Sequence, residues 1–246
     1  MSVATGEHNQ FYDGPLADGL PSIVAAAHEL KSPLALMRQL SLSLEDDNVS
    51  DADRKRMLRQ ITLTSERALR LTSDLTKSVR LEDAMFELEP INPYQLCQDV
   101  AREISPLFEA HHRNIYVSSK KHSWLLVANR DLLKRIIMNF SDNALYYAEG
   151  EGDIEIKIST VNSGKHIRLG VRDYGPAVPK SIINKLKNNL SMGPAPIHTR
   201  PSSSGLGLYI SSQFADVMNG KIGITRHRDG ATFFVELQTS SQLSLL

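Results

Sequence analysis

A heptad spacing of apolar and small side chains runs from about residue 21 to residue 45. Positions that alternate in steps of four and three share one face of a helix, so the pattern predicts a long helix with an apolar seam. The seam consists of Ile23, Ala27, Leu30, Leu34, Met37, Ser41 and Leu44. A helix of this kind needs at least one other helix to cover its seam.

The same spacing returns after residues 45–51, a polar segment that predicts a turn, with Ser50 or Asp51 capping the next helix. The second seam consists of Met57, Ile61, Thr64, Ala68, Leu71, Leu75 and Val79. Two antiparallel helices of about 25–30 residues cannot bury such wide stripes alone, so the simplest arrangement is a homodimeric four-helix bundle through residues 20–83. A monomeric hairpin packed on the rest of the chain is the alternative.

One polar group inside the first helix stands apart from the seam. His28 follows the seam residue Ala27 and is expected to face water, with Glu29 beside it. Pro33 lies mid-helix, where it removes a backbone donor and strains the preceding turn. A surface histidine usually has no special role. A neighbouring carboxylate and a helix-breaking proline favour a functional role for this one.

Composition excludes several classes of protein. Lys and Arg together number 28, as do Asp and Glu, so no basic field predicts a nucleic-acid partner. The single cysteine, Cys97, excludes an internal disulfide, fits a reducing compartment and is expected to be buried. No apolar run is long enough to span a membrane and no secretory leader is present, so we expect a cytoplasmic chain, alone or as part of a membrane-anchored protein.

The second half of the chain alternates between helical and strand patterns. The expected elements are a short strand near 86–91, a helix over 94–110, strands at 114–118 and 124–127, a helix over 131–148 capped by Asn129, strands at 154–158 and 167–171 joined by a turn at 162–164, a helix over 206–218, and strands at 221–225 and 231–237. This order predicts an α+β fold with helices layered on a mixed sheet. We therefore expect an N-terminal arm over 1–19, a helical domain over 20–83 and an α+β domain over 84–246.

Two polar clusters in this domain point to nucleotide chemistry. Asn139 and Asn143 are four residues apart, so they share a helix face where their amide oxygens can ligate Mg²⁺. Asp173 follows a strand and precedes Gly175, and a carboxylate there can accept a hydrogen bond from an exocyclic amine such as that of adenine. Taken alone, each is equally typical of an ordinary polar surface or turn.

A third cluster opens the helix that begins near residue 206. It comprises Ser202, Ser203, Ser204, Gly205, Leu206, Gly207 and Leu208. Serine and glycine at the start of a helix expose backbone N–H groups and the positive end of the helix dipole to a phosphate. A single Gly-x-Gly is a weak signal, but the three clusters in this order, after a helix carrying His-Glu, form a strong one.

With these segments in this order, the chain resembles the catalytic core of two-component sensor histidine kinases. The matching motifs are residues 28–33 for the H box, 139–144 for the N box, 173–176 for the G1 box and 205–208 for the G2 box. The resemblance covers roughly residues 20–240. It implies a dimerisation and phosphotransfer domain followed by the α/β-sandwich ATP-binding domain that the family shares with gyrase.

The resemblance also implies roles for single residues in phosphotransfer. His28 would accept the γ-phosphoryl group of ATP at Nε2, with Glu29 as the base. Ser32 stands where the family has a residue that orients a hydrolytic water. The phosphoryl group would then pass to an aspartate of a response-regulator receiver domain.

In the ATP site, the resemblance implies that Asn143 ligates Mg²⁺ and Asn139 supports the phosphate side. Tyr147 would cover the adenine, Asp173 would bind its amino group, and Gly205 and Gly207 would hinge a lid that closes over the phosphates. The implied ATP-binding residues are Asn139, Asn143, Tyr146, Tyr147, Asp173, Gly175, Arg200, Ser204, Gly205, Leu206, Gly207 and Leu208.

Four departures from the family pattern leave a second reading open. Tyr146 replaces a basic residue, Ala177 and Ser203 replace glycines, and residues 182–190 contain no phenylalanine. Arg200 is our hypothesis for the missing positive charge. The alternative is a degenerate kinase that acts mainly as a response-regulator phosphatase or dimeric scaffold. An ATPase without phosphotransfer is disfavoured, because such enzymes carry a glutamate where this chain has Asn139.

Overall fold

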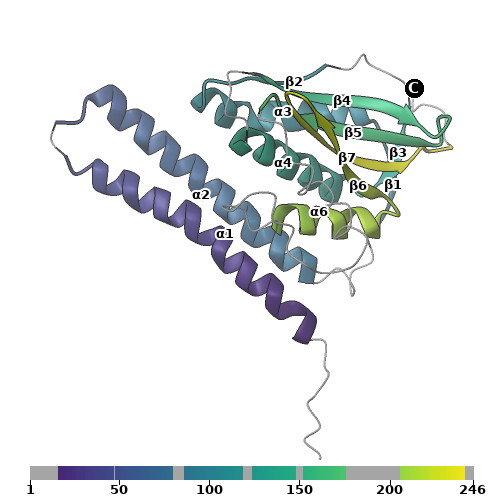
Figure 1. Ribbon diagram of the computed structural model, residues 1–246, viewed down its shortest axis with the longest axis horizontal. Coiled ribbons are helices and arrows are strands. Elements are labelled where there is room, and N and C mark those ends of the chain that lie inside the picture. The colour runs from purple at the N-terminus through teal and green to yellow at the C-terminus, as the bar shows by residue number, and fades with distance from the viewer. Residues whose placement is uncertain are drawn as a thin grey trace, which may run out of the picture.

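The computed structural model describes residues 16–46, 48–79, 86–118, 124–147, 152–175 and 206–241. Two long helices, α1 (Leu16–Ser43) and α2 (Asp51–Val79), form an antiparallel hairpin beside a layered α+β unit (Figure 1). This confirms the expected fold class. None of the described helices is both long enough and apolar enough to cross a membrane.

The sequence predicted the start of α2 correctly but not the start of α1. α1 begins at Leu16, inside the segment that we expected to be an arm, and continues past Pro21 and Pro33. At the start of α2 the backbone N–H of Asp53 donates to Ser50 Oγ at 3.1 Å, and that hydroxyl donates to the Asp53 carboxylate at 2.7 Å. Ser50 is therefore the N-cap, as predicted. The expected domain boundary at 83 lies outside the described residues.

A mixed sheet of five strands forms the centre of the second unit. Its spatial order is β2 (Ile115–Val117), β4 (Ile154–Val161), β5 (His166–Arg172), β7 (Gly230–Gln238) and β6 (Lys221–His227). β2 runs parallel to β4, and the other neighbours are antiparallel. A separate two-stranded ribbon pairs β1 (Glu89–Ile91) with β3 (Leu126–Ala128).

The predicted hairpin turn between β4 and β5 is present. Asn162, Ser163 and Gly164 all have positive φ, at 52°, 55° and 84°. Asparagine and glycine tolerate this left-handed backbone better than other residues, which explains why the turn forms at this point in the chain. The turn fixes the register in which Ile156 of β4 faces Val171 of β5.

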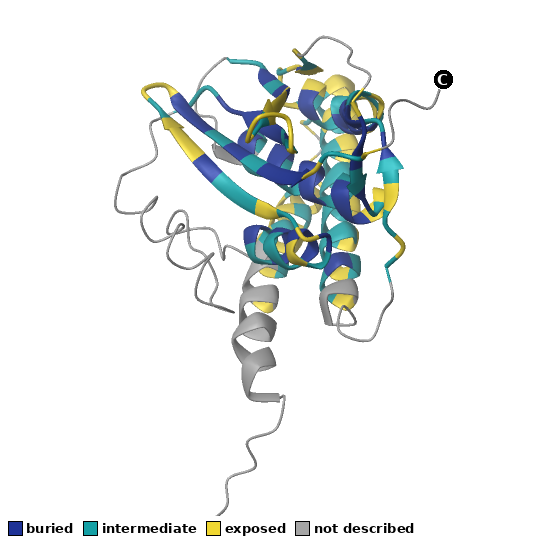
Figure 2. Cartoon of the chain, turned by 90° about the vertical axis from the view of Figure 1, so that its right-hand side faces the viewer, coloured by how far each residue is buried: buried dark blue, intermediate teal, exposed yellow. Residues whose placement is uncertain are grey.

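Three helices cover one face of the sheet: α3 (Pro93–Ala110), α4 (Arg130–Tyr147) and α6 (Leu206–Val217) (Figure 1). Asn92 caps α3, and Asn129 caps α4 by accepting the Leu132 N–H at 3.1 Å. The core lies between these helices and the sheet (Figure 2) and includes Phe108, Phe140, Phe214, Leu132, Ile136 and Ile156. Cys97 is buried as expected, and burial raises the pKa of its thiol to about 12.

The helical hairpin packs against the second unit through α2, which contacts α3 and α6, and through α1, which contacts α6. Two ion pairs join α2 to α4: Asp74 Oδ1 lies 3.3 Å from Arg135 Nε, and Arg67 Nε lies 3.6 Å from Asp142 Oδ2. The Asp74 side chain is only 3% exposed. α2 is therefore bound to the same helix that carries the predicted magnesium ligand.

Candidate functional site

The N box and the G2 box meet where α4 packs against α6. The side chain of Asn139 donates from Nδ2 to the backbone carbonyl of Gly207 at 3.4 Å and to Ser211 Oγ at 3.3 Å. Ser211 Oγ in turn donates to the Gly207 carbonyl at 2.7 Å. Two segments that are 68 residues apart in sequence are therefore joined at the first turn of α6.

Asn143 lies one turn beyond Asn139 on the same helix. It is half-buried, while its neighbours Phe140 and Ala144 are almost fully buried. The amide therefore lies at the edge of the core, where one side chain oxygen can reach a cation that also binds phosphate. Mg²⁺ typically takes one or two protein ligands and completes its shell with phosphate oxygens and water. Asn143 fits such a site, and its role as the magnesium ligand stays a prediction.

The Asp173 carboxylate lies at the end of β5 and is 5% exposed. Its Oδ1 accepts the backbone N–H of Ala231 at 3.2 Å, and its own N–H donates to the Ala231 carbonyl at 3.0 Å. Burial raises the pKa of this carboxyl, while the backbone N–H groups and the neighbouring Arg172 oppose that shift. A buried carboxylate held by main-chain donors is suited to accepting a hydrogen bond from a ligand amine.

Gly207, in the first turn of α6, has an open side among the described residues. A Cβ atom built on Gly207 would meet no atom of the described residues within 4 Å. Leu208, the next residue, is buried and holds the helix on the core. The first backbone N–H groups of a helix have no partner within the helix, so they can donate to an anion that occupies this space.

Of the remaining predicted site residues, Ser32 and Gly175 are described, and the others lie partly or wholly outside the described residues. Ser32 is exposed on α1, and Gly175 is half-buried after Asp173. The backbones of His28 and Glu29 belong to α1 and that of Leu206 opens α6, but their side chains lie outside the described residues. The same holds for the side chains of Tyr146 and Tyr147 and for all of Arg200, Ser204 and Gly205.

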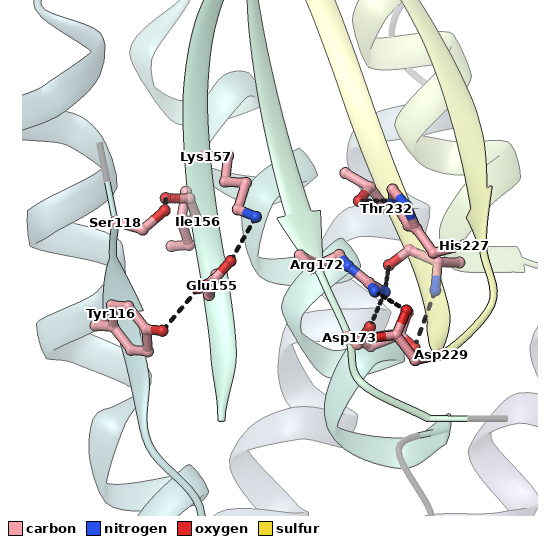
Figure 3. A network of polar contacts seen from close by, with 11 residues as sticks. Tyr116, Ser118, Glu155, Ile156, Lys157, Arg172, Asp173, His227, Asp229 and Thr232 are labelled. Atoms are coloured by element: carbon pink, nitrogen blue, oxygen red, sulfur yellow. Dashed lines mark hydrogen bonds and ion pairs between the residues drawn. The ribbon is translucent and has the colours of Figure 1, made fainter. Parts of the chain in front are cut away.

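Sequence reasoning missed the residues that hold Asp173. They are Arg172, which is buried beside it, Asp229 in the turn between β6 and β7 (Figure 3), and Gly230 and Ala231, the first residues of β7. Gly230 has a φ of +124°, and a Cβ there would lie 2.3 Å from the Asp173 carbonyl oxygen. Glycine at 230 was the one available signal, because a close backbone approach of this kind requires it.

Comparison with known proteins agrees with this geometry. Residues 128–241 match the family model described as histidine kinase-, DNA gyrase B- and HSP90-like ATPase. The chain is 30% identical over 217 residues to the sensor protein kinase PmrB of Pseudomonas aeruginosa, covering 86% of this chain and 43% of that protein. It is 26% identical over 215 residues to the histidine protein kinase SaeS of Staphylococcus epidermidis, covering 86% of this chain and 61% of that protein.

Residues 128–241 belong to that ATPase family, and over 86% of its length the chain is similar to sensor histidine kinases. Its ATP-binding domain is of the type shared with gyrase B and HSP90. The fold agrees as well: the full-length ShkA crystal structure, solved in complex with AMPPNP, has a TM-score of 0.59 over 93% of this chain and 47% of that one at 23% identity. The Acinetobacter baumannii histidine kinase AdeS has a TM-score of 0.55 over 86% of this chain and 97% of that one at 16% identity.

The chain spans only part of its curated relatives, at most 61% of PmrB or SaeS. The match to each covers 86% of this chain, which is more than the ATP-binding domain alone. The similarity therefore extends into the helical hairpin that carries the H box.

Proposed function

We propose that the chain is an ATP-dependent histidine autokinase that phosphorylates His28 and passes the phosphoryl group to a receiver-domain aspartate. The observation that carries the proposal is the joining of N box and G2 box by Asn139, together with the buried Asp173 carboxylate that follows β5 in the same domain. A family relative solved with AMPPNP supports the same nucleotide class.

In the proposed reaction, His28 Nε2 forms a bond to the γ-phosphorus as the bond from that phosphorus to the β–γ bridging oxygen breaks and ADP leaves. Glu29 accepts a hydrogen bond from the imidazole Nδ1–H and takes that proton as the phosphorus–nitrogen bond forms, which makes Nε2 a better nucleophile. Asp173 holds the adenine amine, and the first turn of α6 donates N–H groups to the phosphates. Mg²⁺ held at Asn143 supplies charge neutralisation when bound. Such a reaction depends mainly on positioning and charge stabilisation.

We also propose that the active form is a homodimer built through the hairpin. Five leucines of the hairpin are exposed in one chain: Leu34, Leu36, Leu42, Leu58 and Leu69, at 57%, 38%, 50%, 52% and 67%. Exposed apolar side chains on paired helices favour a second hairpin as the partner, which produces a four-helix bundle. A receiver domain is the second proposed partner, and the cytoplasm, where ATP is available, is the proposed location.

Autophosphorylation tests the proposal directly. The chain is incubated with γ-labelled ATP and Mg²⁺ beside a His28→Gln variant, and the protein-bound label is tested in acid and base. We expect acid-labile, base-stable label on the native chain and none on the variant. Label on both chains places the acceptor elsewhere. ADP binding without any label favours the phosphatase or scaffold reading and directs attention to Tyr146 and Ala177.

A further inference from the structure

Arg172 is a buried cation at the end of β5, directly before Asp173, with a side chain that is only 6% exposed. Its guanidinium donates to the carbonyl oxygen of Asp173, to that of Ala231 at 3.4 Å and to Asp229 Oδ1 at 2.6 Å. The guanidinium carbon also lies 4.4 Å from the centre of the Tyr174 ring. Figure 3 shows Arg172, Asp173 and Asp229 gathered between the end of β5 and the turn that joins β6 to β7.

Residues 229–231, the end of the β6–β7 turn and the start of β7, orient the Asp173 carboxylate. The Ala231 N–H donates to Asp173 Oδ1, and Gly230 packs so closely that a Cβ would lie 2.5 Å from that oxygen. The carboxylate therefore takes its orientation from the position of this segment. The pairing of β7 with β5 and β6 sets the backbone of Gly230 and Ala231, and Arg172 adds a side-chain link, because it bonds both to the backbone of Asp173 and to the side chain of Asp229.

This arrangement requires a planar fork of donors. A guanidinium reaches several oxygens at once in fixed directions, whereas a lysine ammonium presents a single point charge. The carboxylate of Asp229 is 65% exposed and offsets the charge of the buried Arg172. Loss of either partner removes the side-chain link, and a carboxylate that shifts by a fraction of an ångström loses the geometry of a hydrogen bond to a bound amine.

We propose that Arg172, paired with Asp229, is a positioning residue that sets the preference for adenine by holding the Asp173 carboxylate against residues 229–231. The inference rests on the proposed function, in which Asp173 binds the adenine amine. Arg172 itself does not contact the nucleotide in this proposal. Its effect is therefore confined to the amine contact and leaves the phosphate contacts at α6 and α4 unchanged.

The test compares two nucleotides that differ only at that amine. Binding of ADP and of purine riboside diphosphate, which lacks the 6-amino group, is measured by calorimetry with Mg²⁺ for the native chain and for Arg172→Met. We expect the variant to bind ADP about 10-fold more weakly, as loss of one hydrogen bond to a charged group implies. Its affinity for purine riboside diphosphate is expected to change less than about 3-fold, so the selectivity collapses.

Two further variants make the result specific. Arg168→Met is the matched control, because Arg168 lies on the same strand, pairs with Glu236 and packs over Phe234, yet has no described contact with Asp173. We expect it to keep the native selectivity. Asp229→Asn changes an exposed partner, so it tests the same contact even when Arg172→Met fails to fold, and we expect it to reduce selectivity in the same direction.

The outcomes separate the two proposals. Equal weakening of both nucleotides in Arg172→Met and in Asp229→Asn, or no change in either, overturns the positioning role and leaves the kinase proposal standing. A native chain that binds ADP without preference over purine riboside diphosphate overturns the role of Asp173 and with it this inference. A native chain that binds neither nucleotide overturns the proposed function and the inference together.

Discussion

The hairpin and the sheet domain (residues 86–241) differ in how completely they bury their apolar side chains. The sheet domain buries Phe108, Phe140 and Phe214 completely between its helices and its sheet. In the hairpin, the seam residues Leu30, Met37 and Leu44 are only half-buried, and Leu34 is 57% exposed. One unit completes its core within a single chain, whereas the other has apolar surface left for a partner. Mutations of buried apolar residues in the sheet domain should therefore lower the free energy of unfolding, whereas mutations in the hairpin should weaken dimer formation.

Phe140→Ala should have the largest effect on folding. The ring is fully buried on α4 and lies 6.1 Å from the ring of Phe233, measured between centroids. Its removal from a packed core is expected to cost about 3–5 kcal/mol of unfolding free energy. Urea unfolding followed by circular dichroism measures this loss. Phe140→Leu, which keeps most of the volume, should recover more than half of it, and a loss below about 1 kcal/mol for alanine contradicts the self-contained core.

Leu34→Ala should act on assembly instead. Burying the exposed part of two symmetry-related leucines contributes about 2–3 kcal/mol to a dimer, which is roughly a 30- to 150-fold change in dissociation constant. Sedimentation equilibrium measures the change. Lys31→Ala removes an exposed polar side chain one turn earlier on α1 and should leave the constant unchanged. A native chain that stays monomeric at high concentration favours the alternative of a hairpin packed only on its own sheet domain.

Asp74→Asn probes the contact between the two regions. Asp74 is buried against Arg135, whose side chain is 22% exposed, so removal of the negative charge leaves a partly buried cation. The expected loss of stability is about 1–3 kcal/mol, below that of a fully buried pair because water reaches Arg135. Glu109→Gln is the control, since its pair with Arg59 is exposed on both sides and should contribute less than about 0.5 kcal/mol. Equal losses in the two variants contradict a specific connection at Asp74.

Asp173→Asn should have the smallest effect on folding. Burial raises the pKa of this carboxyl, so the folded protein holds its proton more tightly than the unfolded chain does. The group therefore destabilises the fold once the pH rises above the folded pKa. We expect the variant to melt within about 3 °C of the native chain at pH 7, with any change an increase, and to lose most of its ADP affinity. A clear drop in melting temperature at pH 7 contradicts this assignment.

Periodicity predicted the elements of the fold well because it reports which face of each element is buried. The caps at Ser50 and Asn129 and the turn at 162–164 were also predictable, since they depend on residues within three positions of one another. The start of α1 at Leu16 was not, because Asp18 and Gly19 are poor helix formers and intrinsic propensity is only a weak guide.

In the candidate site, too, the residues within short motifs could be predicted, whereas those brought together only by the fold could not. Asn139, Asp173 and Gly207 could be selected from motifs, and the structure brings the segments of Asn139 and Gly207 into contact. The role of Arg172 could not be read from the sequence. An arginine at the end of a strand is usually exposed, and its partner Asp229 lies 57 residues away. Only the pairing of β5 with β7 brings the two together.

The ion pair between Arg67 and Asp142 has a mechanical consequence. Asp142 immediately precedes Asn143 on α4, and Arg67 lies near the middle of α2, a rod about 40 Å long. A torque applied at either end of that rod reaches the helix that carries the predicted metal ligand through two ion pairs, this one and the one between Asp74 and Arg135. The combined strength of the two pairs sets how firmly α2 and α4 move together.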